Sequence, residues 1–176
     1  MKGKIWVKSM LEAYNHINKV IKTIDKQVID KGVKSHFTFG YVETMEVMDA
    51  IIELERRKQK LVCIKNLVED SLKTIPRQSA EILALRFIDK LSDSEIAKLL
   101  KVSKRTFFRI LDKALGDCYV AFLRLGFNCE YLERQLENEK WLVSFYNQNV
   151  DKKTQKKKLK FSNISNKASV VNYLWN

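Results

Sequence analysis

Residues 91–115 read LSDSEIAKLLKVSKRTFFRILDKAL, and this stretch decides how the second half of the chain folds. Ser92 and Glu95 match the S-x-x-E capping box, in which each side chain satisfies a free backbone N–H group at the start of a helix. A short helix is therefore expected over residues 93–100. After a tight turn, Ser103 is expected to be the N-cap of a second helix.

The second expected helix carries two adjacent phenylalanines, Phe107 and Phe108, whose side chains point about 100° apart. Apolar residues recur from Phe107 at the helical spacing, so Phe107 is expected inside and Phe108 on the outer face. There Phe108 either packs against another part of the chain or meets a partner. The predicted core of the helix pair consists of Ile96, Ala97, Leu100, Val102, Phe107, Ile110 and Leu111.

The outer face of this second helix is basic. An α-helix fits the major groove of DNA, where Arg and Lys reach guanine or phosphate and an aromatic ring contacts a thymine methyl group. The free N–H groups at the start of the helix also favour phosphate. The alternative is that the cations are simply solvated. The candidate DNA-binding residues are Ser103, Lys104, Arg105, Thr106, Phe108, Arg109, Asp112 and Lys113.

Residues 75–115 resemble region 4 of the sigma-70 family of transcription initiation factors. The resemblance implies contacts with the promoter −35 element from Lys104, Arg105, Phe108, Arg109 and Asp112, and docking on the flap of RNA polymerase. The matching positions are Pro76, Leu85-Arg86-Phe87, Leu91-Ser92, Glu95-Ile96-Ala97, Leu100, Val102-Ser103 and Ala114-Leu115.

Sigma region 2, whose aromatic cluster melts the −10 element, is not recognisable in residues 1–75. The resemblance therefore indicates a small sigma-like regulator rather than a complete sigma factor. Many such regulators are encoded by phages and mobile elements of low-GC bacteria. Response-regulator output domains share much of the same pattern.

Two long amphipathic helices are expected before this stretch. From Met10 to Val28, apolar residues are spaced alternately four and three apart, and the helix is expected to end near Lys31-Gly32. After a connector over residues 32–42, a second helix over residues 43–74 is expected to fold back as an antiparallel hairpin. The hairpin either packs on itself or is a dimerisation or docking arm. Some apolar residues lie beyond one seam and must meet another domain or another chain: Leu11, Val20, Met45, Met48, Ile52, Val62 and Ile64.

The chain is expected to end in one more helix and a basic tail. Asn128 is a suitable N-cap for a helix to about Gln148, after glycines at 116 and 126. Residues 151–176 hold seven lysines and one aspartate, which is half of the net charge of +12. The tail is either solvated or contacts phosphate. The candidate phosphate contacts are Lys152, Lys153, Lys156, Lys157, Lys158 and Lys160.

The composition favours an all-α protein, because one proline and five glycines in 176 residues leave few helix breaks. The expected division is a helical hairpin (1–75), a helix-turn-helix domain (76–127), a C-terminal helix (128–150) and the basic tail. A pI of about 9.6 points to an anionic partner. No secretion signal or membrane span is recognised, so a cytoplasmic location is expected.

No enzyme activity, cofactor or metal is expected. Cys63, Cys118 and Cys129 are widely spaced and should be reduced, mostly buried thiols. The expected function is that of a sequence-specific transcriptional regulator that binds double-stranded DNA and RNA polymerase, with a possible homodimer through the hairpin. The alternative is a non-catalytic polymerase-binding or scaffold protein that uses the same fold without base readout.

Overall fold

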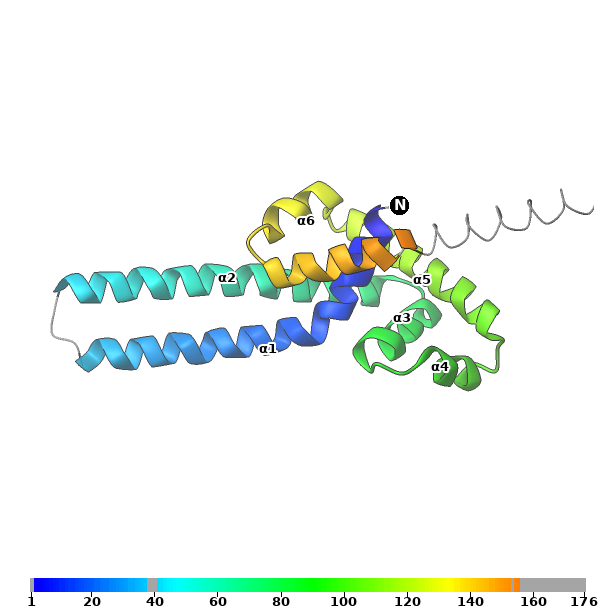
Figure 1. Ribbon diagram of the computed structural model, residues 1–176, viewed down its shortest axis with the longest axis horizontal. Helices are drawn as coiled ribbons and strands as arrows, with labels where there is room; N and C mark the ends of the chain where they lie inside the picture. The colour runs from blue at the N-terminus through cyan, green and yellow to red at the C-terminus, as the bar shows by residue number, and fades with distance from the viewer. Residues whose placement is uncertain (1, 38–40, 153, 156–176) are drawn as a thin grey trace, which may run out of the picture.

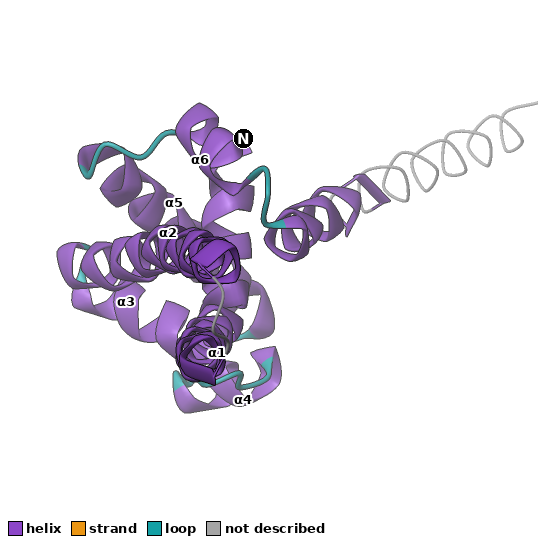
Figure 2. Ribbon diagram, turned by 90° about the vertical axis from the view of Figure 1, so that its left-hand side faces the viewer, coloured by secondary structure: helices purple, strands orange, loops and turns teal. Residues whose placement is uncertain are grey.

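The computed structural model describes residues 2–37, 41–152 and 154–155, and the regular structure within these ranges is entirely helical (Figure 2). The predicted all-α fold is confirmed. In the part of the chain described, no helix is long and apolar enough to cross a membrane. Two long helices form an arm, and shorter helices gather around one end of it (Figure 1).

The arm consists of α1 (Lys2–Phe37) and α2 (Tyr41–Thr74), which run side by side in opposite directions. The Tyr14 hydroxyl donates a hydrogen bond to Glu69 Oε1 at 2.6 Å, and Lys58 Nζ lies 2.8 Å from Asp25 Oδ1. The seam of α2, which consists of positions spaced alternately four and three apart, contains Val47, Ile51, Leu54, Lys58, Leu61, Lys65, Val68 and Leu72. Lys58 and Lys65 are the two lysines that interrupt this seam. The hydrogen bond with Asp25 raises the pKa of Lys58 and fixes the alignment of the two helices.

The expected end of the first helix is wrong. The helix begins at Lys2, and it continues through Gly32 to Phe37. A glycine inside a helix costs about 1 kcal/mol, which packing along α2 outweighs in a helix of 36 residues. The predicted connector over 32–42 is correspondingly shorter, and its residues 38–40 lie outside the described ranges.

Shorter helices follow the arm. They are α3 (Arg77–Leu83), the π-helical turn η1 (Ala84–Ile88), α4 (Asp93–Leu99), α5 (Lys104–Arg124) and α6 (Cys129–Leu136), and residues 140–152 are helical as well. Pro76 is the N-cap of α3.

Gly116 does not end α5, which continues to Arg124, because the start of α1 packs across it. A Cβ at Gly116 would lie 3.3 Å from Lys4 Cε, and a Cβ at Gly3 would collide with the ring of Tyr119. These glycines therefore permit a close approach of two helices instead of a turn.

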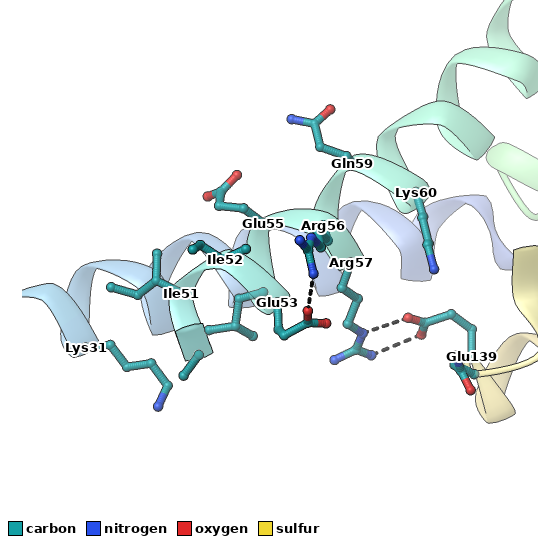
Figure 3. Close-up of a pocket in the computed structure, with 13 residues that line it drawn as sticks. Lys31, Ile51, Ile52, Glu53, Glu55, Arg56, Arg57, Gln59, Lys60 and Glu139 are labelled. Atoms are coloured by element: carbon teal, nitrogen blue, oxygen red, sulfur yellow. Dashed lines mark hydrogen bonds and ion pairs between the residues drawn. The ribbon is translucent and has the colours of Figure 1, made fainter. Parts of the chain in front are cut away.

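The single C-terminal helix expected from Asn128 to Gln148 is interrupted at residues 137–139. The interruption coincides with Glu139, which is only 4% exposed. Arg57 on α2 donates to both Glu139 oxygens, at 2.7 and 3.0 Å, beside a groove of about 1290 Å³ (Figure 3). This hydrogen bonding raises the pKa of Arg57 and holds the interruption against the arm.

Two apolar clusters hold the fold together. The larger one takes residues from α1, α2, α3, α5 and α6, so the segments 1–75, 76–127 and 128–150 share it. Trp6 stacks on Tyr146 with ring centroids 4.2 Å apart, which joins the start of α1 to the C-terminal segment. The smaller cluster contains buried Ile82, Ile96, Ala97 and Phe107, and it supports α4 and the start of α5.

Candidate nucleic-acid interface

The start of α4 is fixed by the predicted capping box. The Ser92 side chain accepts a hydrogen bond from Glu95 N at 3.2 Å, and Ser92 N donates to Glu95 Oε2 at 2.8 Å. Hydrogen bonding of the Glu95 carboxylate, first to the Ser92 side chain and then to the Ser92 backbone N–H, lowers the pKa of Glu95 because it stabilises the charged form. The capping box is therefore confirmed as the local cause of this helix start.

The turn between α4 and α5 depends on a lysine in the left-handed conformation. Lys101 has a φ of +52°, and its neighbour Val102 donates from its backbone N–H to the carbonyl of Ala97 at 3.0 Å. Glycine is the usual residue at such a helix end. The sequence located the turn here but gave no signal for its left-handed residue.

The start of α5 leaves backbone donors available at the surface. Ser103 accepts from Thr106 N at 3.1 Å, as its predicted N-cap role requires. The other first-turn N–H groups have no partner within a helix and carry the positive end of its dipole. Figure 1 shows that α4 and this end of α5 lie away from the tip of the arm.

The two adjacent phenylalanines separate as predicted. Phe107 is fully buried among Ile82, Ile96 and Ala97, while Phe108 is 45% exposed. Their ring centroids are 5.5 Å apart. The remaining predicted core residues of the helix pair, Leu100, Val102, Ile110 and Leu111, are half-buried around this cluster.

Arg86 positions α4 on the preceding π-helical turn. Its Nε lies 2.6 Å from Asp93 Oδ1, and its Nη1 donates to the carbonyl of Leu91 at 3.3 Å. Arg86 belongs to the motif that resembles sigma region 4, and no role was predicted for it. The helical pattern held no signal for this pairing.

The predicted basic residues lie together on the exposed face of α5. Lys104, Arg105, Arg109 and Lys113 are all exposed, and none of them forms an ion pair with another described residue. Four cations without internal partners concentrate positive charge beside Phe108. Such a face attracts a polyanion.

Asp112 on this face forms an ion pair with Lys4. Lys4 Nζ lies 2.8 Å from Asp112 Oδ2 and also donates to the Asp112 carbonyl at 3.0 Å. Without Lys4, the Asp112 carboxylate would be available to Arg109, three residues earlier on the helix. The role of Lys4 was missed, since the two residues are 108 positions apart.

The predicted tail contacts are mostly outside the described ranges. Lys152 is described and exposed, at the end of the C-terminal helical segment. Lys153, Lys156, Lys157, Lys158 and Lys160 lie outside the described residues. Their contact with phosphate stays a prediction.

The described residues include three cysteines and the other side chains that can bind metal ions. Among them, no group of three or more His, Cys, Asp or Glu side chains could hold a metal ion. Burial raises the pKa of the Cys118 thiol to about 11, which makes it unreactive. Cys63 is exposed, so the expectation of mostly buried thiols is wrong for this residue, which faces outward on α2.

No family model, no curated protein and no solved structure matches this chain.

Proposed function

We propose that this chain is a sequence-specific DNA-binding transcriptional regulator that inserts the first turns of α5 into the major groove. In this proposal Arg105 and Arg109 contact base edges, Phe108 contacts an apolar base surface, and Lys104 and Lys113 contact phosphate. An α-helix with this order of charges matches the width and chemistry of the groove.

One observation carries the proposal. The cations of α5 are exposed without internal ion pairs, while the one acidic residue among them is paired to Lys4. The face is therefore basic, and it lies beside a helix start that favours phosphate. The small apolar cluster below it keeps the helix rigid, which reduces the entropy lost on binding.

RNA polymerase is the second partner in this proposal, which rests here on the resemblance to sigma region 4. One recognition helix supplies about 1–3 kcal/mol of discrimination for each good base contact, which is modest against competing sites. A second anchor raises the local concentration of the helix at the promoter. We assign this contact to no single residue.

The test is to select a binding site from random DNA and to measure the affinity of variants for it. We expect Arg105→Ala and Arg109→Ala each to weaken binding by about 5- to 150-fold, because each loses one base contact worth about 1–3 kcal/mol. Arg124→Ala is the matched control, since Arg124 is also exposed and lies on the same helix. Its affinity should stay near that of the wild type.

Circular dichroism shows whether the variants keep their helices, since exposed side chains contribute little to folding. If both variants bind the selected site as tightly as the wild type, α5 does not read DNA. If selection from random DNA enriches no site, the protein is no sequence-specific binder.

A second candidate function is supported by two exposed apolar side chains near the turn. Leu99 is 64% exposed and Phe108 is 45% exposed. Apolar side chains at a surface favour a protein partner. Under this candidate the helix pair binds RNA polymerase without base readout, and Leu99→Glu abolishes polymerase capture while leaving DNA affinity unchanged.

A further inference from the structure

The half of the arm nearest its tip exposes apolar side chains. Of the eleven large apolar residues that are exposed within the described ranges, five lie here. Scattered apolar residues are normal at a surface, but a group on one element marks an interaction site. They are Ile29, Val33, Met45, Met48 and Ile52, with exposed fractions between 44% and 64%.

These side chains share one side of the arm. Ile29, Met48 and Ile52 directly follow seam residues, and the next residue along a helix points about 100° further round. Because α1 and α2 are antiparallel, the residue that follows a seam residue points to the same side of the helix pair in both helices. Arg57, which directly precedes the seam residue Lys58, faces the other side, where residues 137–152 lie (Figure 2). Of the five apolar side chains, Ile52 also lines the groove beside Asn138 and Glu139, and the other four do not line it.

A groove lies further along the same side of α2. Its volume is about 320 Å³, and its apolar lining includes Val62, Leu67, Leu125 and Phe127. The exposed thiol of Cys63 also lines it. The apolar tip residues of α2 and the apolar groove thus lie on one face of this helix. Residue 48 at the tip and residue 62 in the groove are about 20 Å apart along the helix axis, at 1.5 Å per residue.

The charge of α2 changes sign between these two features. Residues 41–55 contain five acidic residues and no Lys or Arg, and residues 56–65 contain five Lys or Arg and no acidic residue. Some of these charges pair within the chain, as Arg57 does with Glu139. On the apolar side itself Glu55 pairs with Lys58 and Arg56 pairs with Glu53, while Lys60 lies on the side of α2 that faces Glu139 (Figure 3).

We propose that this face binds a second copy of the chain, with α2 antiparallel to α2 of the partner and the two-fold axis near residues 55 and 56. Such a pairing places the acidic half of each helix against the basic half of the other. It also places the tip residues Met45, Met48 and Ile52 on the groove of the other copy. A two-fold interface needs a self-complementary surface, and this pattern supplies one.

In this dimer, the shorter helices α3 to α6 of the two copies lie at opposite ends of the paired α2 helices. From residue 55 to the end of α2 is about 30 Å, so the ends of the two α2 helices lie about 60 Å apart. This consequence rests on the proposed function: two recognition helices then need half-sites about two turns of DNA apart or more. The dimer itself does not depend on DNA binding.

Sedimentation equilibrium of the full chain under reducing conditions tests the dimer. The expected mass is twice 20.7 kDa, and Met48→Glu should reduce it to 20.7 kDa, since it adds a charge to the apolar face. Leu99→Glu is the matched control, because Leu99 is also exposed but lies on α4, and this variant should remain dimeric. A wild-type chain that sediments as a monomer at every concentration overturns the proposal.

A disulfide tests the alignment. With the axis near residues 55 and 56, position 48 lies opposite the partner's Cys63. Within one chain these positions are about 22 Å apart along the helix, well beyond the roughly 7 Å limit for a disulfide between Cα atoms. Mild oxidation of Met48→Cys should therefore give a covalent dimer linked between positions 48 and 63, and adding Cys63→Ser should remove it.

A covalent dimer linked between the two copies of position 48 would overturn this alignment. Failure of the dimer proposal in the sedimentation or disulfide experiment is distinct from failure of the proposed function, because neither experiment contains DNA. A chain that dimerises but selects no DNA site contradicts only the proposed function. A chain that selects a site as a monomer contradicts only the dimer.

Discussion

Replacing Phe107 and Phe108 separately by alanine should give very different losses of stability. Phe107 is fully buried in a small cluster, and removal of a buried phenylalanine ring costs about 3–5 kcal/mol of unfolding free energy. Phe108 is 45% exposed. Full burial of such a side chain contributes about 1.5–3 kcal/mol, so its partial burial contributes about 1 kcal/mol. The two variants should therefore differ by about 2–4 kcal/mol.

Urea denaturation followed by far-UV circular dichroism measures both losses. The same two proteins separate packing from DNA contact, because Phe108→Ala should weaken binding to a selected site while the protein remains folded. If Phe108→Ala destabilises the protein as much as Phe107→Ala, the ring is a packing residue and the assignment of the outer face is wrong. If it leaves DNA affinity unchanged, Phe108 contacts no base.

Three further perturbations test the surroundings of the helix pair. Lys4→Ala should change the unfolding free energy by less than about 1 kcal/mol, since its ion pair with Asp112 is exposed. The same variant should bind DNA more weakly, because the Asp112 carboxylate is then unpaired beside the cations. Equal affinity of variant and wild type in fluorescence anisotropy would contradict this expectation. Because the pKa of Glu95 is lowered on folding, its carboxylate stabilises the fold above its ordinary pKa of 4.5, and this stabilisation is lost as the pH falls through the lowered value. Thermal unfolding across this acidic range should therefore show a smaller pH dependence for Glu95→Gln, and an equal dependence would refute the role of the carboxylate. Deletion of residues 151–176 should flatten the salt dependence of DNA binding, because fewer counterions are released, whereas an unchanged slope would mean that the tail does not contact phosphate.

The helix starts could be predicted from sequence because their causes are local. Ser92, Ser103 and Asn128 each accept a hydrogen bond from a backbone N–H three residues later. This interaction needs no distant residue, so a short motif carries the whole signal. The inward and outward positions of Phe107 and Phe108 follow in the same way from helical spacing.

The helix ends were predicted less well because distant contacts decide them. Gly32 and Gly116 cost about 1 kcal/mol each inside a helix, and packing against a second helix outweighs that cost. The interruption before residue 140 accompanies the hydrogen bonds between Arg57 and Glu139, which are 82 positions apart. No local pattern contains this information.

In the candidate site, too, the features with local causes could be predicted and those that depend on distant contacts could not. Its cations could be predicted, because the N-cap and the spacing place them on the exposed face of α5. The pairing of Lys4 with Asp112 could not, because it depends on how the start of α1 crosses α5. The left-handed Lys101 was also missed, since glycine is the residue that normally signals this conformation.

The central claim is that α5 reads bases, and the most direct test is the sequence preference of a single variant. Binding sites are selected from random DNA for the wild type and for Arg109→Gln, which removes the guanidinium but keeps a polar side chain. We expect one motif for the wild type, and for the variant a changed preference at one or two adjacent base pairs with the rest of the motif retained. Identical motifs for both proteins, or no motif for the wild type, would contradict the claim.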